Sequence, residues 1–141
     1  MKFFFTSGAT ESNNIAIQGL KEYAEKSNRK HIITTAIEHK AVLETVKHLE
    51  SEGFDVDIVS PDLTGRVSEE KILEKVKDNT LLVSVMHVNN ETGIIQPVKE
   101  IGEKLQERGI LFHIDATQSC GKLVEEIRSI KYDMLSFSAH N

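Results

Sequence analysis

Apolar and polar positions along the chain change their spacing several times, and each change predicts a new element. The β-branched stretch 31–35 and the mostly apolar stretch 81–88 are typical of buried strands. Residues 54–59 alternate between apolar and polar side chains, which predicts a half-exposed strand at the edge of a sheet. Shorter apolar runs complete the expected set of strands: residues 2–5, 110–114 and 134–137.

Helical spacing separates these strands. In residues 10–24 and 42–49, apolar side chains recur every three or four positions, as on one face of a helix. Ser68 is expected to cap a third helix, and a fourth is expected to begin at Pro97 and end at Gly109. The alternation of strands and helices predicts an α/β fold, with a mostly parallel sheet that has helices on both faces.

Composition limits the class of protein. The chain has 141 residues, of which 39% are hydrophobic and 28% are charged, as expected for one globular domain or part of a larger one. A formal net charge of −5 and the lack of a basic stripe argue against direct nucleic-acid binding. No apolar run approaches the ~18 residues that span a bilayer, so no membrane association is expected. The single cysteine, Cys120, suits a reducing compartment and predicts a cytoplasmic protein.

Unusual polar residues follow five of the expected strands. In open α/β sheets, ligands bind beyond the carboxyl ends of the strands. Because parallel strands end at one edge, we expect these groups to form a shared polar pocket. They are residues 6–13, 38–40, 87–93, 113–118 and 136–140.

Two of these groups suggest an anionic ligand with a cationic ring. Residues 7–10 open a helix directly after a strand, where free backbone N–H groups can bind phosphate, although they could equally be a plain helix cap. Asp115 closes an apolar strand, and a buried carboxylate there would need a cation such as a protonated heterocyclic nitrogen. Gln118 could donate to a ligand oxygen from the same turn. Alternatively, Asp115 caps the helix that follows.

The remaining polar candidates each allow a ligand-binding and a structural interpretation. His39 could stack on an aromatic ligand or move protons, or it could be a satisfied polar residue near a helix start. Asn90 could bind a ligand or form a turn. Ser138 and His140 lie at a strand end and could bind an anion together.

Two other chemistries fit the sequence poorly. Ser138, His140 and Asp115 are the residue types of a hydrolase triad, but the GxSxG elbow is missing. His113 and Asp115 could bind a metal with a second histidine, yet no spacing matches a zinc or iron signature. We therefore expect no metal site.

The same segments resemble a known family. Residues 5–14, 38–42, 87–93, 113–119 and 136–140 resemble, in order, the motifs of the cofactor domain of cysteine desulfurases. These are pyridoxal-phosphate enzymes of fold type I, in the class V aminotransferase superfamily. The resemblance covers nearly the whole chain and implies that it is part of the large, cofactor-binding domain.

The resemblance implies pyridoxal 5′-phosphate as the cofactor and assigns it site residues. His39 would stack on the pyridine ring and move protons, as the catalytic residue. Asp115 would pair with the pyridinium nitrogen and keep it protonated. The other implied cofactor-binding residues are Ala9, Thr10, Ser138 and His140 at the phosphate, and Asn90 and Gln118 at the ring hydroxyl.

The implied reaction removes sulfur from L-cysteine and gives L-alanine and an enzyme persulfide. That sulfur would pass to an acceptor or an iron–sulfur scaffold protein, for cluster assembly or thiolation, and the family implies a homodimer. Two alternatives remain: a non-catalytic scaffold that keeps the cofactor pocket, and a selenocysteine lyase-like enzyme.

The chain departs from the family pattern at its end. Asn141 stands at the position of the Schiff-base lysine, so either the lysine is substituted or the chain is a truncated product whose last residue is not native. The small C-terminal domain and the loop with the sulfur-accepting cysteine are expected to be absent from this chain. The isolated chain is therefore expected to be inactive. In the family sheet, strand one pairs with a seventh strand beyond Asn141. Residues 2–5 and the outer side of 134–137 are accordingly expected to be unpaired edges.

Overall fold

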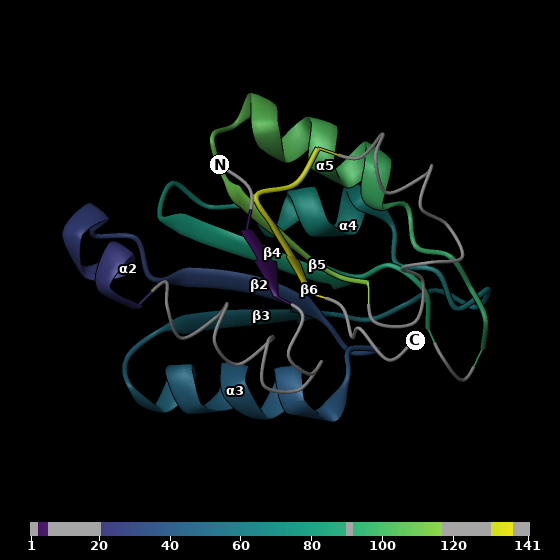
Figure 1. Cartoon of the computed structure of the whole chain (residues 1–141), viewed down its shortest axis with the longest axis horizontal. Coiled ribbons are helices and arrows are strands. Elements are labelled where there is room, and N and C mark those ends of the chain that lie inside the picture. The colour runs from purple at the N-terminus through teal and green to yellow at the C-terminus, as the bar shows by residue number, and fades with distance from the viewer. Residues whose placement is uncertain (1–2, 6–20, 90–91, 117–130, 137–141) are drawn as a thin grey trace.

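The protein folds around one parallel β-sheet. A computed structural model describes residues 3–5, 21–89, 92–116 and 131–136 (Figure 1). Its strands all pair in parallel, in the order β1-β6-β5-β4-β2-β3. The strands are β1 (Phe3–Phe5), β2 (His31–Thr35), β3 (Asp55–Val59), β4 (Thr80–Met86), β5 (Leu111–Asp115) and β6 (Met134–Ser136).

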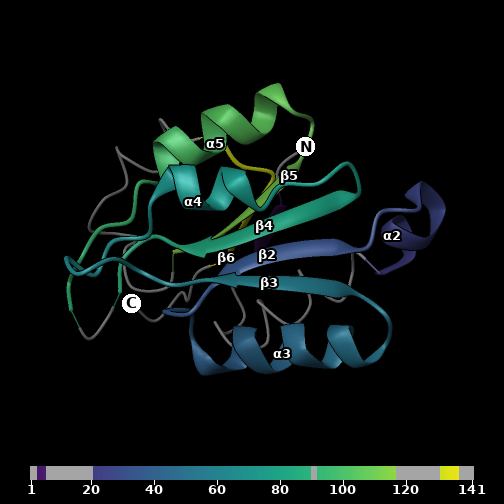
Figure 2. The same cartoon turned by 180° about the vertical axis from the view of Figure 1, so that it is seen from behind.

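Helices cover both faces of this sheet. Helix α3 lies against one face, and α4 and α5 lie against the other (Figures 1 and 2). This arrangement confirms the predicted α/β class. The described helices are α2 (Lys21–Ser27), α3 (Lys40–Ser51), α4 (Glu69–Glu74) and α5 (Val98–Glu107).

Each face of the sheet has its own apolar core. Because side chains alternate along a strand, β2 and β4 contribute residues to both cores. Helical residues three or four positions apart complete each core from outside. Large buried members are Ile32, Val46, Leu49 and Leu82 on the α3 side, and Ile33, Ile72, Ile101, Leu105 and Phe112 on the other.

The predicted helix boundaries at Ser68 and Gly109 are confirmed. The Ser68 hydroxyl accepts hydrogen bonds from the backbone N–H of Glu70 at 3.1 Å and of Lys71 at 3.4 Å, and so caps α4. Helix α5 ends at the cap residue Arg108, and Gly109 follows with φ of 69°. Only glycine adopts such a left-handed conformation without steric cost.

The predicted edge position of β3 is also confirmed. This strand pairs only with β2 among the described strands and ends the sheet. Ile58 is 45% exposed although it is one of the apolar residues in the alternating stretch 54–59. The edge of the sheet leaves its outward side chain in contact with solvent.

The expectation that the first and last strands are unpaired is wrong. Strand β1 pairs directly with β6, with Phe3 opposite Met134 and Phe5 opposite Ser136. An unpaired edge presents a row of free N–H and C=O groups, and pairing satisfies one such row on each strand. Strand β1 consequently forms the second edge of the sheet.

Candidate active site

Three neighbouring strands end at the same edge of the sheet and bring polar residues together there. The turn after β2 contains Glu38 and His39, the segment after β4 contains His87 and Asn89, and β5 ends at Asp115. Strand β4 lies between β2 and β5, so the three segments are neighbours. The strand order therefore puts these described residues at the same carboxyl edge, whereas the predicted shared polar pocket stays a prediction.

Asp115 is a buried acid at this edge. Asp115 is only 3% exposed, and it lies opposite Met86 in the pairing of β4 with β5. The backbone carbonyl of Asp115 accepts a hydrogen bond from the N–H of His87 at 2.9 Å, which fixes the strand end. A buried carboxylate is stable only beside donors or a cation. A buried carboxylate is an acceptor whose chemistry fits a cationic ring nitrogen such as that of pyridoxal phosphate.

His39 lies at the start of α3 and is exposed. Its backbone carbonyl accepts hydrogen bonds from the N–H groups of Val42 at 3.0 Å and Leu43 at 3.2 Å. The position of His39 is thus fixed by the helix, while its side chain reaches solvent at the carboxyl edge. An exposed imidazole can exchange protons with a ligand or with water.

Several predicted site residues lie outside the described part of the chain. The phosphate end of the expected cofactor site and the lysine position therefore have no structural description, whereas His39 and Asp115 do. The predicted site residues outside the described ranges are Ala9, Thr10, Asn90, Gln118, Ser138 and His140, and Asn141 at the lysine position also lies outside them.

Glu38 is a buried acid to which the sequence analysis assigned no role. Its Oε2 atom accepts a hydrogen bond from the Thr35 hydroxyl at 2.5 Å and from the Met86 N–H at 2.9 Å. Its Oε1 atom is buried and has no hydrogen-bond partner among the described residues. Burial, together with the nearby Asp115 carboxylate, raises the pKa of Glu38 to about 8, although the two hydrogen bonds oppose this rise.

His113 is a second buried group beside Asp115. Its Nδ1 atom lies 2.7 Å from the Ser84 hydroxyl, and neither residue is exposed. Burial lowers the pKa of His113 to about 4, and the Asp115 carboxylate offsets this only in part. At neutral pH, both Glu38 and His113 are therefore uncharged next to Asp115. The one available sequence signal was the spacing of His113 and Asp115, which places them on one face of β5.

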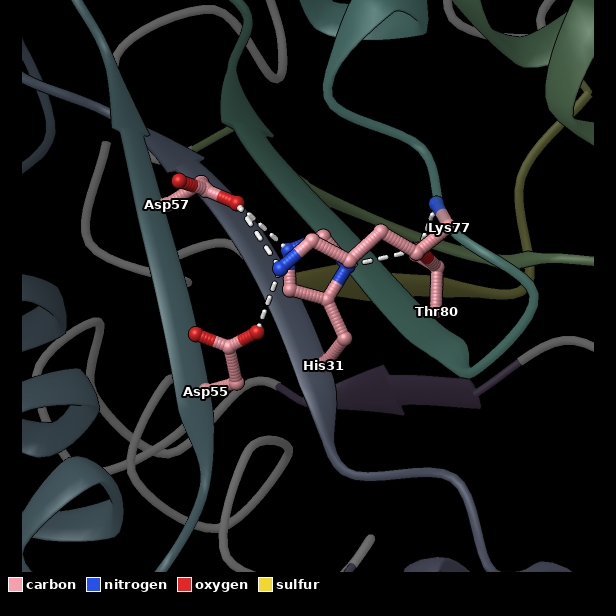
Figure 3. A network of polar contacts seen from close by, with 5 residues as sticks. All are labelled: His31, Asp55, Asp57, Lys77 and Thr80. Carbon is pink, nitrogen blue, oxygen red and sulfur yellow. Dashed lines mark hydrogen bonds and ion pairs between the residues drawn. The ribbon is translucent and has the colours of Figure 1, made fainter.

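A different polar network joins the amino ends of β2, β3 and β4 (Figure 3). The buried His31 ring contacts Thr80 Oγ1 through Nδ1 at 2.6 Å and Asp57 Oδ2 through Nε2 at 2.7 Å. The Lys77 ammonium donates to Asp55 Oδ2 at 2.6 Å. This network lies at the sheet edge opposite to Asp115.

The order hydroxyl, imidazole, carboxylate in this network resembles a hydrolase triad, but its hydroxyl is inaccessible. Thr80 is 1% exposed, and its oxygen also accepts the Lys77 backbone N–H at 2.7 Å. A nucleophile must reach its substrate, so the network links strands and performs no such chemistry.

Within residues 3–5, 21–89, 92–116 and 131–136, no group of three His, Cys, Asp or Glu side chains is arranged to hold a metal ion. No helix in the same ranges has both the length and the apolar character needed to cross a membrane.

Known proteins resemble this chain in sequence. Cysteine desulfurase IscS of Photorhabdus laumondii is 51% identical over 136 residues, which cover 96% of this chain and 33% of that protein. IscS of Buchnera aphidicola is 48% identical over 139 residues, with 34% of its length covered. The chain thus spans about a third of the length of the curated relatives it matches.

Solved structures and a family model agree with this similarity. The crystal structure of DndA from Streptomyces lividans superposes with a TM-score of 0.91 at 52% identity, over 96% of this chain and 37% of that one. The structure of SspA in complex with cysteine gives 0.89 at 45% identity, over 96% and 39%. The aminotransferase class-V family model matches residues 2–141, and these matches confirm the resemblance on which the sequence analysis relied. With its parallel sheet and its buried aspartate at the carboxyl edge, this chain belongs to the aminotransferase class-V family.

Proposed function

We propose that this chain forms the pyridoxal 5′-phosphate-binding part of a cysteine desulfurase. In the proposed reaction, the C–S bond of L-cysteine breaks, the sulfur joins a protein thiol as a persulfide, and the carbon skeleton leaves as L-alanine. The names of the sequence relatives and the cysteine in the SspA structure support this reaction class. When bound, pyridoxal phosphate supplies an electron sink beside the amino-acid Cα.

The observation that carries the proposal is the burial of Asp115 at the carboxyl edge. A carboxylate with 3% exposure can pair with a protonated ring nitrogen without competition from bulk water. This pairing would hold the proton on the nitrogen. Asp115 would thereby keep the cofactor in its electron-accepting form.

His39 is proposed to stack on the cofactor ring and to move protons during the reaction. Its exposed position at the start of α3 supports access to a ligand at this edge. The remaining proposed contacts would hold the phosphate and the ring hydroxyl. They are made by Ala9, Thr10, Ser138 and His140, and by Asn90 and Gln118, respectively.

The proposal includes protein partners and a location. A sulfur acceptor or iron–sulfur scaffold protein would receive the persulfide sulfur, and the full-length protein would form a homodimer. A single cysteine suits the reducing cytoplasm as the place of action.

A second candidate function is cofactor binding without turnover. The observation that favours it is Asn141 at the position where the family has its Schiff-base lysine, because an amide cannot form an imine. Under this alternative, the chain binds pyridoxal phosphate and L-cysteine but releases no product.

One experiment separates the two candidates. Pyridoxal phosphate is titrated into the chain and followed by absorbance, and L-cysteine is then added with a thiol reductant. Alanine and sulfide above a cofactor-free control would support the desulfurase, whereas saturable binding without product would support the non-catalytic function. If no saturable binding occurs at all, both candidates fail.

A further inference from the structure

Glu38 connects the end of β2 to the end of β4. Its Oε2 atom accepts from the Thr35 hydroxyl at 2.5 Å, within its own turn, and from the Met86 N–H at 2.9 Å, on the neighbouring strand. A second bridge runs parallel to it, since the Asn89 side-chain amide donates to the Ile37 carbonyl at 3.3 Å. Two side chains therefore hold the turn after β2 against the segment that ends β4.

This turn contains His39. Because Glu38 directly precedes His39, the hydrogen bonds of the Glu38 carboxyl restrain the backbone from which the imidazole extends. On the other side, the His39 carbonyl is fixed by the first turn of α3 through Val42 and Leu43. Glu38 and α3 together determine where the imidazole lies relative to the carboxyl edge.

The surroundings of the Glu38 carboxyl suit a neutral acid. The groups that face it are the Thr35 hydroxyl, the Met86 N–H and the Asp115 carboxylate, and no lysine or arginine of the described ranges pairs with it. Both donors bind Oε2, and Oε1 is buried with no donor among the residues that the structure describes. An anion would leave charge on an unsolvated oxygen near a second carboxylate, which is strongly unfavourable. A protonated Oε1 avoids this cost, and the pKa of about 8 agrees.

We propose that Glu38 is a positioning residue, a neutral carboxylic acid that anchors the His39 turn to β4 and leaves the negative charge of this edge on Asp115. This inference rests on the proposed function, because it concerns the same cofactor site. It assigns Glu38 no contact with substrate or cofactor. Glu38 acts through the placement of His39 and through the absence of a second charge beside Asp115.

Three variants separate anchoring from charge. Glu38→Gln keeps the size, the neutral state and an oxygen that can accept from Thr35 and Met86. Glu38→Ala removes both hydrogen bonds. Glu50→Gln is the matched control, because Glu50 is an exposed glutamate on α3.

The first measurement uses the chain without cofactor. A pKa raised from 4.5 to about 8 means that the stability linked to Glu38 is complete below pH 4.5 and is lost as pH rises through 8. The melting temperature of the wild type should therefore fall relative to Glu38→Gln between pH 5 and pH 8, and the Glu50→Gln control should follow the wild type. Carbon-13 NMR should show the Glu38 carboxyl titrating near pH 8. Parallel melting curves, or a carboxyl that titrates near its ordinary pKa, would overturn the neutral acid.

The second measurement follows His39 by NMR while pyridoxal phosphate is added. Glu38→Gln should bind within about threefold of the wild type and keep the ring shift of His39, whereas Glu38→Ala should bind about tenfold more weakly and lose that shift. Wild-type behaviour of Glu38→Ala would overturn the anchoring role.

If the wild type itself does not bind pyridoxal phosphate, the proposed function fails separately. The anchor is then judged without cofactor by the His39 amide signal, which should move in Glu38→Ala and not in Glu38→Gln.

Discussion

The Ser84 hydroxyl lies 2.7 Å from Nδ1 of His113, across the register pair that these residues form on β4 and β5. Both side chains are completely buried. Burial lowers the pKa of His113 to about 4, so at neutral pH a hydroxyl is hydrogen-bonded to an uncharged imidazole. The ring therefore adds no positive charge beside Asp115.

This pKa predicts an acid-dependent loss of stability. A folded-state value of about 4 lies below the usual 6.5, so the stability linked to His113 is complete above pH 6.5 and is lost as pH falls through 4. The loss should amount to about 3 kcal/mol. We expect the free energy of unfolding of the wild type to fall by this amount relative to His113→Gln, which cannot ionise, between pH 7 and pH 4. A difference that stays constant over this range would contradict the assignment.

Asp115→Ala should weaken pyridoxal phosphate binding more than His39→Ala. Removing one partner of a buried charge pair costs ~3–5 kcal/mol, whereas ring stacking contributes ~1 kcal/mol. Asp115 is 3% exposed and would form the buried charge pair, whereas His39 is exposed and would make the stacking contact. Fluorescence titration measures both, with Asp78→Asn, an exposed acid in the turn before β4, as the control. Equal losses for the two site variants would contradict the proposed roles.

Much of the fold could be predicted because burial imposes local patterns. Strand β2 matches the predicted residues 31–35 at both ends, since a strand buried along its whole length needs uninterrupted apolar or β-branched side chains. Ser68 was identifiable as a cap because its hydroxyl serves backbone groups only two and three residues away. Such signals lie entirely within short segments of the chain.

Pairing between distant strands could not be predicted in the same way. The apolar run at residues 3–5 has the same pattern whether it pairs with β6 or with another strand. The choice of β6 depends on the position of Met134, more than a hundred residues along the chain, and on which edge of the sheet remains open.

In the candidate site, too, features set by local sequence could be predicted and features set by distant residues could not. The placement of His39 and Asp115 at the same edge followed from the strand ends, because parallel strands end together. The role of Glu38 did not follow, since its main partner outside its own turn is the Met86 N–H, 48 residues away. Its protonation depends on burial and on a carboxylate from β5, and neither is visible near Glu38 in the sequence.

His31→Ala should destabilise the fold without affecting the carboxyl edge. The buried imidazole bridges Thr80 and Asp57, so its loss leaves a buried hydroxyl and a half-buried carboxylate without this partner (Figure 3). We expect a loss of about 1.5–3 kcal/mol in the free energy of unfolding. Lys77→Ala removes an exposed ion pair from the same network and should change stability little. Equal effects of the two variants in urea denaturation would contradict the bridging role.

Gly102→Ala should destabilise the chain although it lies inside helix α5. Alanine is favoured over glycine in a helix by ~1 kcal/mol, so propensity alone predicts a gain. A Cβ at Gly102, however, would lie 2.3 Å from the backbone carbonyl oxygen of Lys131. This carbonyl cannot turn away as a flexible side chain can, because the same segment is held by hydrogen bonds between Asp133 and Phe112 at 2.8 and 2.9 Å. Relief of the clash requires α5 or the segment before β6 to shift, at a cost of ~1–3 kcal/mol.

Glu103→Ala, on the exposed side of the same helix, is the control and should stay within ~0.5 kcal/mol of the wild type. Urea denaturation measures both, and a Gly102→Ala chain more stable than the wild type would show that α5 and the Lys131 segment are not in close contact.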